Sequence, residues 1–210
     1  MSRFLHVSQH PLVQHHLARL RDRQTQPPEF RQLVKHIAQI LFFEAAYDLP
    51  LLDSTVLTPI GECAVKTVQE NIGLVPILRA GLGIADAMLD LFPTAVVWHL
   101  GLYRDHHTLE PVTYYNKLPA TSNLDMALVL DPMLATGGSA IASIEILKRW
   151  GGCKRIKFIG ILAAPEGVAS LHQAHPDIPV HLAAVDERLN EIGYIVPGLG
   201  DAGDRQFGTW

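Results

Sequence analysis

The chain has 210 residues, which fits one domain and allows a fold to bury about 70% of the surface that the unfolded chain exposes. With 48% hydrophobic and 18% charged residues, the composition indicates a compact globular protein and excludes an intrinsically disordered one. The formal net charge of -4 argues against nucleic acid as a partner, and two cysteines are too few for a disulfide framework. No apolar run approaches the roughly 18 residues of a membrane span, so we expect a soluble, cytoplasmic protein without a membrane partner.

The N-terminal part of the chain has the periodicity of two helices, within residues 10–48. Residues 10–24 and 28–48 each repeat apolar side chains at intervals of three and four, and the prolines "PP" mark the start of the second helix. Residues 54–71 show only a weak pattern, with turn residues in "TPIGE". The sequence therefore predicts neither a helix nor a strand for this stretch.

The remainder of the chain alternates between short apolar runs and helical patterns. The runs are typical of strands that are buried on both faces, and helical patterns at 83–92, 139–150 and 166–175 separate several of them. The runs are "GLVPIL" at 73–78, "TAVVWHL" at 94–100, "MALVLD" at 126–131, "IKFIGILA" at 156–163 and "VHLAAV" at 180–185. This alternation predicts an α/β fold with a mostly parallel sheet covered by helices on both faces.

Two segments interrupt the alternation. Residues 101–125 form a long polar insertion that contains the strand-like "PVTYYNKL", and a loop of this length in a compact domain is usually a lid or flap. The tail 193–210 is rich in glycine but also carries aromatic residues, which is unusual for a fraying terminus. Both segments are candidates to contribute residues to a functional site.

The most informative stretch is "VLDPMLATGGSAI", residues 129–141. Asp131 ends an apolar strand, and ligands of open parallel sheets bind at the carboxyl ends of strands. Residues 136–139, "TGGS", would direct backbone N–H groups at one point and open a helix, whose N-terminus favours an anion. This pattern predicts a phosphate-binding loop, with Asp131 placed to accept hydrogen bonds from sugar hydroxyls. On these residues alone, an ordinary strand–turn–helix connection remains an alternative.

Four separated motifs in this sequence resemble the uracil phosphoribosyltransferase family, within the type I phosphoribosyltransferases. They are "VPILRAGLG" (75–83), "YR…LEPVTYYNKLP" (103–119), "DPMLATGGS" (131–139) and "YIVPGLGDAGDR" (194–205). The resemblance implies one domain over residues 1–210, built on a mostly parallel twisted sheet flanked by helices. It also implies N-terminal helices at 10–48, a flap hairpin at 101–125 and a C-terminal base-binding hood at 187–210.

The implied reaction joins uracil to 5-phosphoribosyl 1-diphosphate (PRPP), giving UMP and diphosphate in pyrimidine salvage. Arg79, Arg104, Asp131 and Asp201 are the residues that the resemblance places in catalysis, with the two arginines on the diphosphate. These four residues are also implied to bind PRPP, together with Pro132, Met133, Leu134, Ala135, Thr136, Gly137, Gly138 and Ser139. The cofactor implied is Mg²⁺, which PRPP itself carries, with Asp201 as a candidate protein contact.

The tail is implied to read the base through its backbone. "GLGDAG" at 198–203 matches the dinucleotide pattern G-x-G-x-x-G, but only seven residues follow it, too few for the ribose acid of that motif. The resemblance instead assigns uracil to an extended hood strand that contributes Ile195, Gly200, Asp201 and Ala202. A non-proline cis peptide is also implied near Arg79.

Two departures from the wider superfamily bear on the chemistry. Pro132 stands where the common signature has a second acid, and Ala135 stands where many purine enzymes place an acid near the leaving base. The usual loop general base is therefore absent, and the group that accepts the N1 proton of uracil stays open.

Two alternatives to this function are a uridine-nucleotide-binding regulator of the same fold and a phosphoribosyltransferase for another base. A regulator of RNA or DNA should show a basic face or an added domain, and the sequence has neither sign. A homodimer through the N-terminal helices is expected. Some relatives are activated by GTP, and the sequence leaves open whether GTP acts on this protein.

Overall fold

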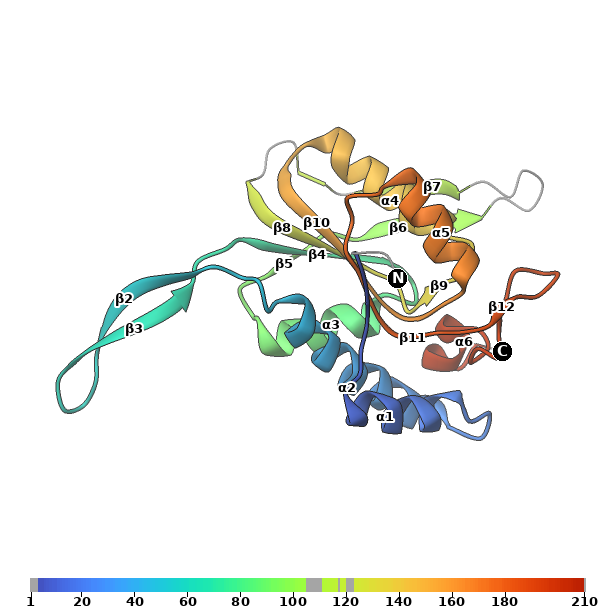
Figure 1. Cartoon of the computed structure of the whole chain (residues 1–210), viewed down its shortest axis with the longest axis horizontal. Helices are drawn as coiled ribbons and strands as arrows, with labels where there is room; N and C mark the ends of the chain where they lie inside the picture. Colours follow the sequence, from blue (N-terminus) through green and yellow to red (C-terminus); the bar gives the residue numbers. More distant parts are fainter. Residues whose placement is uncertain (1–3, 105–110, 117, 120–122, 210) are drawn as a thin grey trace.

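The computed structural model describes residues 4–104, 111–116, 118–119 and 123–209, without the side chains of 102–104, 111–114 and 116 (Figure 1). Two helices, α1 (Pro11–Arg21) and α2 (Pro27–Ala45), occupy the predicted N-terminal region, and each begins at proline. Proline suits the first helical turn because the amide hydrogen that it lacks would have no partner there. No helix among the described residues has the length and apolarity needed to cross a membrane.

Nine strands of the described chain form one sheet in the order β1-β11-β10-β8-β4-β6-β7. Short strands add to it beside β4 and β10, and every pair is parallel except β6 with β7. The bounds are β1 Leu5–Val7, β4 Ile72–Leu78, β5 Val96–Val97, β6 Leu100–Arg104, β7 Pro111–Asn116, β8 Leu124–Leu130, β9 Met133–Leu134, β10 Cys153–Ala163 and β11 Val180–Val185.

Helices cover both faces of this sheet, which confirms the predicted architecture. On β8, Met126, Leu128 and Leu130 pack into the core beside α1, α2 and α3 (Leu82–Leu91). Ala127 and Val129 pack into the opposite core, with α4 (Gly138–Trp150) and α5 (Pro165–Ala174). Successive side chains of a strand point to opposite faces, so a central strand between two helical layers must be apolar throughout. Figure 1 shows these two layers on either side of the strands.

The apolar run 94–100 is not one strand, as the sequence predicted, but the two strands β5 and β6. Val96 pairs with Gly73 and Leu100 pairs with Ile77, so the register along β4 is the same on both sides of the break. Between them, the ring of Trp98 packs edge-on against Trp150 of α4, with ring centroids 5.0 Å apart. The chain therefore follows β4 continuously but interrupts its strand geometry where Trp98 packs.

A hairpin that the sequence did not predict projects from the body of the molecule (Figure 1). It consists of β2 (Leu51–Leu57) and β3 (Glu62–Val68), paired antiparallel along their full length. Its tip is solvent-exposed, with Leu57 at 85% and Ile60 at 100% exposure. A strand pattern arises from one buried face, and this hairpin has none within the chain, which explains the weak signal in the sequence.

The C-terminal region differs from the extended strand that the family resemblance implied. Strands β12 (Arg188–Leu189) and β13 (Ile195–Val196) form a small antiparallel pair, and residues Ala202–Phe207 form the helix α6. Asp201 caps α6, because its side chain accepts a hydrogen bond from the Asp204 amide at 2.9 Å. The hood is thus a pair of short strands, a turn and a helix, and the expectation of an extended backbone through Ala202 is wrong.

Candidate active site

Three loops meet where the central strands end. A Cβ placed on Gly81, after β4, would lie 2.3 Å from the carbonyl oxygen of Leu130, so the backbone after β4 touches the end of β8. A Cβ placed on Gly203 would lie 3.9 Å from Ala80 Cβ, which brings α6 against the same loop. The predicted diphosphate loop, phosphate loop and hood therefore converge, although they are far apart in the sequence.

The predicted phosphate loop encloses a cavity of about 140 Å³ at the N-terminus of α4. Gly137 has φ +87°, a left-handed conformation that glycine adopts without the steric cost of a side chain, and it caps the helix. The N-terminus of α4, whose first-turn amides and dipole favour negative charge, makes this cavity suited to an anion. The lining residues are Asp131, Met133, Leu134, Ala135, Thr136, Gly137, Gly138, Ser139, Ala140 and Gly193.

Asp131 lines this cavity and comes directly after β8. Its Oδ1 accepts a hydrogen bond from the Met133 amide at 3.2 Å. The pKa of Asp131 is raised to about 7, because burial and the charge of Asp201 together outweigh the opposing effect of the Met133 hydrogen bond. Two carboxylates that influence each other in this way form a position where a bound cation or a hydroxyl donor is favourable.

Arg79 follows the predicted non-proline cis peptide, Leu78–Arg79, which the structure confirms. Its side chain lies against the C-terminal tail: Nη2 is 3.2 Å from Asp204 Oδ1, and Nη1 donates to Thr209 Oγ1 at 3.4 Å. The guanidinium also lies 5.9 Å from the centre of the Phe207 ring. The arginine predicted to bind diphosphate is therefore ion-paired within the protein, at an exposed position.

Arg104 ends β6, opposite Pro111 of β7, at the root of the predicted flap hairpin. The side chain of Arg104 and residues 105–110 of the flap lie outside the described part of the structure. The antiparallel pairing of β6 with β7 agrees with the strand character predicted for "PVTYYNKL".

The predicted base-binding residues lie on successive parts of the hood. Ile195 is buried in β13, Gly200 has φ +82° in the turn, and Ala202 is the first residue of α6. Gln206 of α6 is buried, and its Nε2 donates to the carbonyls of Ala80 at 2.9 Å and Ala202 at 3.1 Å. The hood is thus bonded directly to the loop that carries Arg79.

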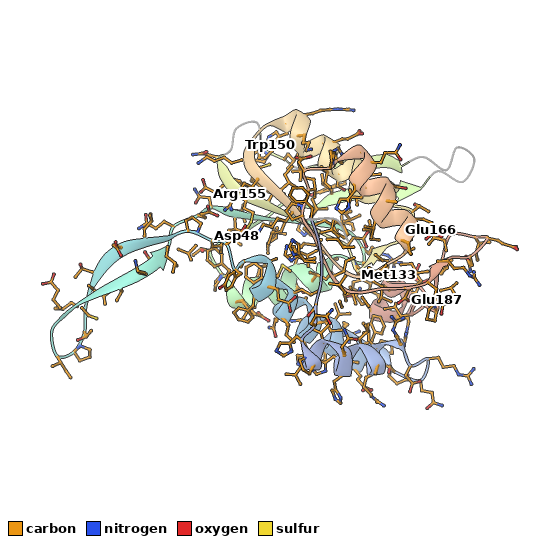
Figure 2. The ribbon with its side chains drawn as sticks, viewed as in Figure 1. Asp48, Met133, Trp150, Arg155, Glu166 and Glu187 are labelled. Carbon is orange, nitrogen blue, oxygen red and sulfur yellow. The ribbon has the colours of Figure 1, made fainter. Side chains whose placement is uncertain are left out.

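Several residues at this site were not predicted. Gly193 lines the phosphate cavity, and its only sequence signal was membership of the family-like tail. Glu166 and Glu187 lie at the same end of the molecule as Met133, which was predicted, whereas Asp48 and Arg155 lie toward the β2–β3 hairpin (Figure 2). Glu166 Oε1 accepts a hydrogen bond from the Leu189 amide at 3.1 Å, so α5 also holds the hood.

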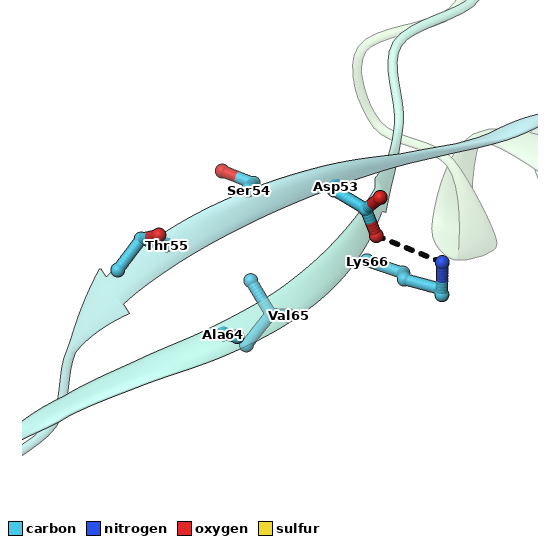
Figure 3. Close-up of a pocket in the computed structure, with 6 residues that line it drawn as sticks. All are labelled: Asp53, Ser54, Thr55, Ala64, Val65 and Lys66. Carbon is cyan, nitrogen blue, oxygen red and sulfur yellow. Dashed lines mark hydrogen bonds and ion pairs between the residues drawn. The ribbon is translucent and has the colours of Figure 1, made fainter.

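A second depression, of about 460 Å³, follows the β2–β3 hairpin and is lined by Asp53, Ser54, Thr55, Ala64, Val65 and Lys66 (Figure 3). Its two charged side chains pair with each other at 2.8 Å, and it is an open surface of a two-stranded ribbon. Among the described residues, no three His, Cys, Asp or Glu side chains gather as a metal site. The loops around Asp131 are therefore the strongest candidate for chemistry.

Comparison with known proteins identifies the family. The family model described as uracil phosphoribosyltransferase matches residues 7–209. A uracil phosphoribosyltransferase from Roseiflexus sp. (strain RS-1) is 63% identical over 203 residues, covering 97% of each chain. A solved structure from Aquifex aeolicus has a TM-score of 0.91 at 36% identity, covering 98% of each chain. A purine phosphoribosyltransferase from Pyrococcus horikoshii, at 12% identity over 76% of this chain and 84% of that one, has a TM-score of 0.51 and shows the shared fold alone.

The predicted resemblance and the predicted fold are thereby confirmed. The match spans the phosphate loop, the Arg79 loop and the hood, which are the three segments that meet beside Asp131. The chain belongs to the uracil phosphoribosyltransferase family.

Proposed function

We propose that this protein transfers the 5-phosphoribosyl group of PRPP to N1 of uracil, giving UMP and diphosphate. A bond forms between uracil N1 and ribose C1, the bond from C1 to the diphosphate oxygen breaks with inversion, and N1 loses its proton. The observation that carries this proposal is the anion cavity beside Asp131, in a chain that the family model matches over residues 7–209.

The phosphate loop is proposed to hold the 5′-phosphate of PRPP. Its cavity of about 140 Å³ is lined by the first residues of α4, whose amides and helix dipole favour an anion. Residues 132–135 shape the wall, with Met133 and Leu134 fixed by pairing to Leu162 and Ala163 of β10. The ribose then lies beside Asp131, which accepts hydrogen bonds from its hydroxyls.

Arg79 and Arg104 are proposed to bind the diphosphate as it leaves. A guanidinium carries a permanent charge and a fork of donors that matches phosphate oxygens. Arg79 is within reach of a ligand because its side chain is 56% exposed, but it must exchange Asp204 for that ligand. In this mechanism catalysis comes from positioning and electrostatics, without a nucleophilic side chain.

The hood is proposed to read uracil through backbone groups of Ile195, Gly200 and Ala202, with Asp201 toward the ribose. The O2, N3 and O4 edge of uracil presents acceptor, donor and acceptor, which backbone N–H and C=O groups complement. Ala135 in the loop has no proton-accepting side chain, so the base is not activated from that position.

Mg²⁺ is proposed as the cofactor, bound through PRPP. The fit to this site lies in the carboxylates of Asp131 and Asp201, because the charge of Asp201 raises the pKa of Asp131 and a cation would relieve that repulsion. When bound, Mg²⁺ neutralises charge on the diphosphate. Asp201 is the candidate protein contact.

The setting of the enzyme is also proposed: pyrimidine salvage in the cytoplasm, as a homodimer, with GTP as a candidate activator. Exposed apolar side chains of α2 and its C-terminal end, Phe43 at 64% and Tyr47 at 93% exposure, support an interface at the N-terminal helices. The net charge of -4 and the names of the relatives favour the enzyme over a nucleic-acid regulator or an enzyme for another base.

A spectrophotometric assay with PRPP, Mg²⁺ and each of uracil, cytosine and guanine tests the proposal. Cytosine presents an acceptor at N3 and a donor at N4, and each mismatch strands buried polar groups at about 1–3 kcal/mol. We therefore expect uracil to be preferred by roughly 30-fold to above 10⁴-fold. Turnover of cytosine within tenfold of uracil, or faster turnover of guanine, would overturn the proposed specificity.

A further inference from the structure

We propose that Arg21, Asp186 and Arg205 are positioning residues that hold the base-reading turn of the hood from behind, so that base choice depends on side chains that do not touch the base. This inference rests on the proposed function and assigns new residues to it. Arg21 and Asp186 lie outside the four motifs, and Arg205, the last residue of the motif at 194–205, had no predicted role.

The Arg21–Asp186 pair holds Gly198 by both of its backbone polar groups. Arg21 Nη1 donates to Asp186 Oδ2 at 2.8 Å and to the carbonyl of Gly198 at 2.8 Å. Asp186 Oδ2 in turn accepts from the Gly198 amide at 2.8 Å. The Asp186 side chain is 5% exposed, and the pair joins the end of α1 to the hood.

Electrostatics agree with this geometry. Burial by itself would raise the pKa of Asp186, but the hydrogen bond from Arg21, the Gly198 amide and the Arg21 charge together lower that pKa. Asp186 is therefore ionised in the folded protein, and loss of Arg21 would leave a buried charge without its partner.

Arg205 holds the next residue of the same turn. Its Nη1 donates to the carbonyl of Leu199 at 2.9 Å and to the carbonyl of Leu20 at 2.8 Å, and Nη2 donates to the carbonyl of Asp22 at 2.5 Å. The guanidinium lies 4.5 Å from the centre of the Phe30 ring. Three carbonyls and an aromatic face thus hold one side chain between the end of α1 and the turn.

Arg21, at the end of α1, and Arg205, on α6, join the turn to the corner between α1 and α2. They border a cavity of about 440 Å³ with Arg23, Thr25, Gln26 and Pro197–Gly200, whereas the phosphate cavity contains none of these residues. Asp201, two residues beyond Leu199, acts electrostatically on Asp131. The end of the turn, at Asp201, therefore belongs to the reaction site, whereas Gly198 and Leu199 in its middle are bonded to side chains at the α1–α2 corner.

This arrangement answers a requirement of backbone recognition. A turn that reads a base with its own N–H and C=O groups has no side chain to adjust, and Gly198 and Gly200 both have positive φ. Such a turn keeps one geometry only if other residues hold it. A displacement of about 1 Å at a reacting centre can cost on the order of 100-fold in rate.

The test compares Arg21→Ala, Asp186→Asn and Arg205→Lys with the wild type, using full steady-state kinetics for uracil, cytosine and PRPP. Arg19→Ala is the matched control, because Arg19 is on the same helix and makes an exposed ion pair with Glu29 at 2.8 Å. We expect KM for uracil to rise about 10- to 100-fold and the uracil-to-cytosine preference to fall about tenfold in each positioning variant. KM for PRPP should stay within about threefold, and Arg19→Ala should match the wild type.

An equal rise in both KM values, or a change only in the amount of folded protein, would overturn the inference. If Arg21→Ala does not fold, Arg205→Lys carries the same expectation, because it keeps the charge and removes only the fork of donors. A wild-type protein without activity on uracil would refute the proposed function instead. An active wild type with unaffected variants would refute only the positioning role.

Discussion

The phosphate loop and the base-reading turn of the hood are built in opposite ways. The phosphate loop is one continuous segment fixed mainly by its backbone: the Met133 amide donates to Asp131, β9 pairs with β10, and Gly137 caps the helix that follows. The hood turn is held by side chains from elsewhere, since Arg21 bonds to it across 177 residues of sequence and Gln206 bonds it to the loop after β4.

The difference concerns where each half of the site can be damaged. A loop that consists of one segment loses its binding geometry when its own backbone is disturbed, and one added methyl group is enough to disturb it. A turn that is held by several distant side chains loses only some of its contacts in any one substitution, so each substitution has a smaller effect on activity. The following predictions probe that contrast.

Gly137→Ala should have the largest effect, a loss of roughly 100-fold or more in kcat/KM for PRPP. The left-handed backbone at φ +87° is strained by any Cβ, at about 1–2 kcal/mol. The added Cβ would also lie 3.1 Å from the Gly167 carbonyl oxygen, a tight contact, and we expect the resulting shift to disturb the phosphate-binding geometry. Kinetics with PRPP, together with thermal unfolding, measure both consequences.

The matched control for that variant is Gly151→Ala at the other end of α4. Gly151 also has positive φ, +70°, and a Cβ there would meet no atom within 4 Å. It should lower stability by a similar amount and leave KM for PRPP unchanged. A similar kinetic loss in both variants would show that helix stability, and not the cavity, controls PRPP use.

Asp131→Asn should lower PRPP efficiency by roughly 10- to 150-fold at pH 8, because a hydrogen bond to a charged group is worth about 1.5–3 kcal/mol. The amide keeps the shape of the carboxylate and removes its charge. Isothermal calorimetry with PRPP provides a readout apart from turnover. Wild-type affinity in this variant would remove Asp131 from the ribose site.

The same contrast explains what the sequence could predict. All the signals of the phosphate loop lie within residues 129–141, so an apolar strand, an acid and a run of small residues suffice to locate it. The helical form of residues 202–207 carried no comparable signal, because α6 is short and depends on Gln206 and Arg205 bonding to distant backbone. Arg21 and Asp186 are 165 residues apart, and no periodicity links them.

The outer parts of the fold were missed for a related reason. Strand β1 has three residues and depends on its pairing with β11, and the β2–β3 hairpin has no buried face to generate alternation. The buried strands β4, β8, β10 and β11 were predicted, because each is apolar along most of its length. Sequence patterns report burial, so elements that bury little leave little trace.

The pH dependence of PRPP binding should follow Asp131. With a pKa of about 7 in the free protein, Asp131 is protonated at lower pH, so the advantage of the wild type over Asp131→Asn should shrink about tenfold per unit below pH 7. The ratio to the variant cancels titration of the PRPP phosphate itself. The folded protein also holds a proton that the unfolded chain releases near pH 3.9, so wild-type stability should fall relative to the variant from about pH 4 to 7. A pH-independent ratio would contradict the assignment.

The smallest expected effect is a gain, from Asp204→Asn. Asp204 Oδ1 forms an ion pair with Arg79 Nη2 at 3.2 Å. The Asp204 and Arg79 side chains are 35% and 56% exposed, so the pair contributes only about 0.2–1 kcal/mol to stability. Because the diphosphate must replace Asp204 at this arginine, removal of the carboxylate charge should tighten PRPP binding by roughly 1.5- to 5-fold. The asparagine keeps an oxygen for the Thr209 hydroxyl, which donates to Asp204 at 2.6 Å, and it leaves the Asp201 cap of α6 intact. A double-mutant cycle with Arg79→Ala isolates the exchange: the gain should vanish when Arg79 is absent. A gain of equal size in the Arg79→Ala background would mean that Asp204 acts by general repulsion of the anion, and not by occupying Arg79.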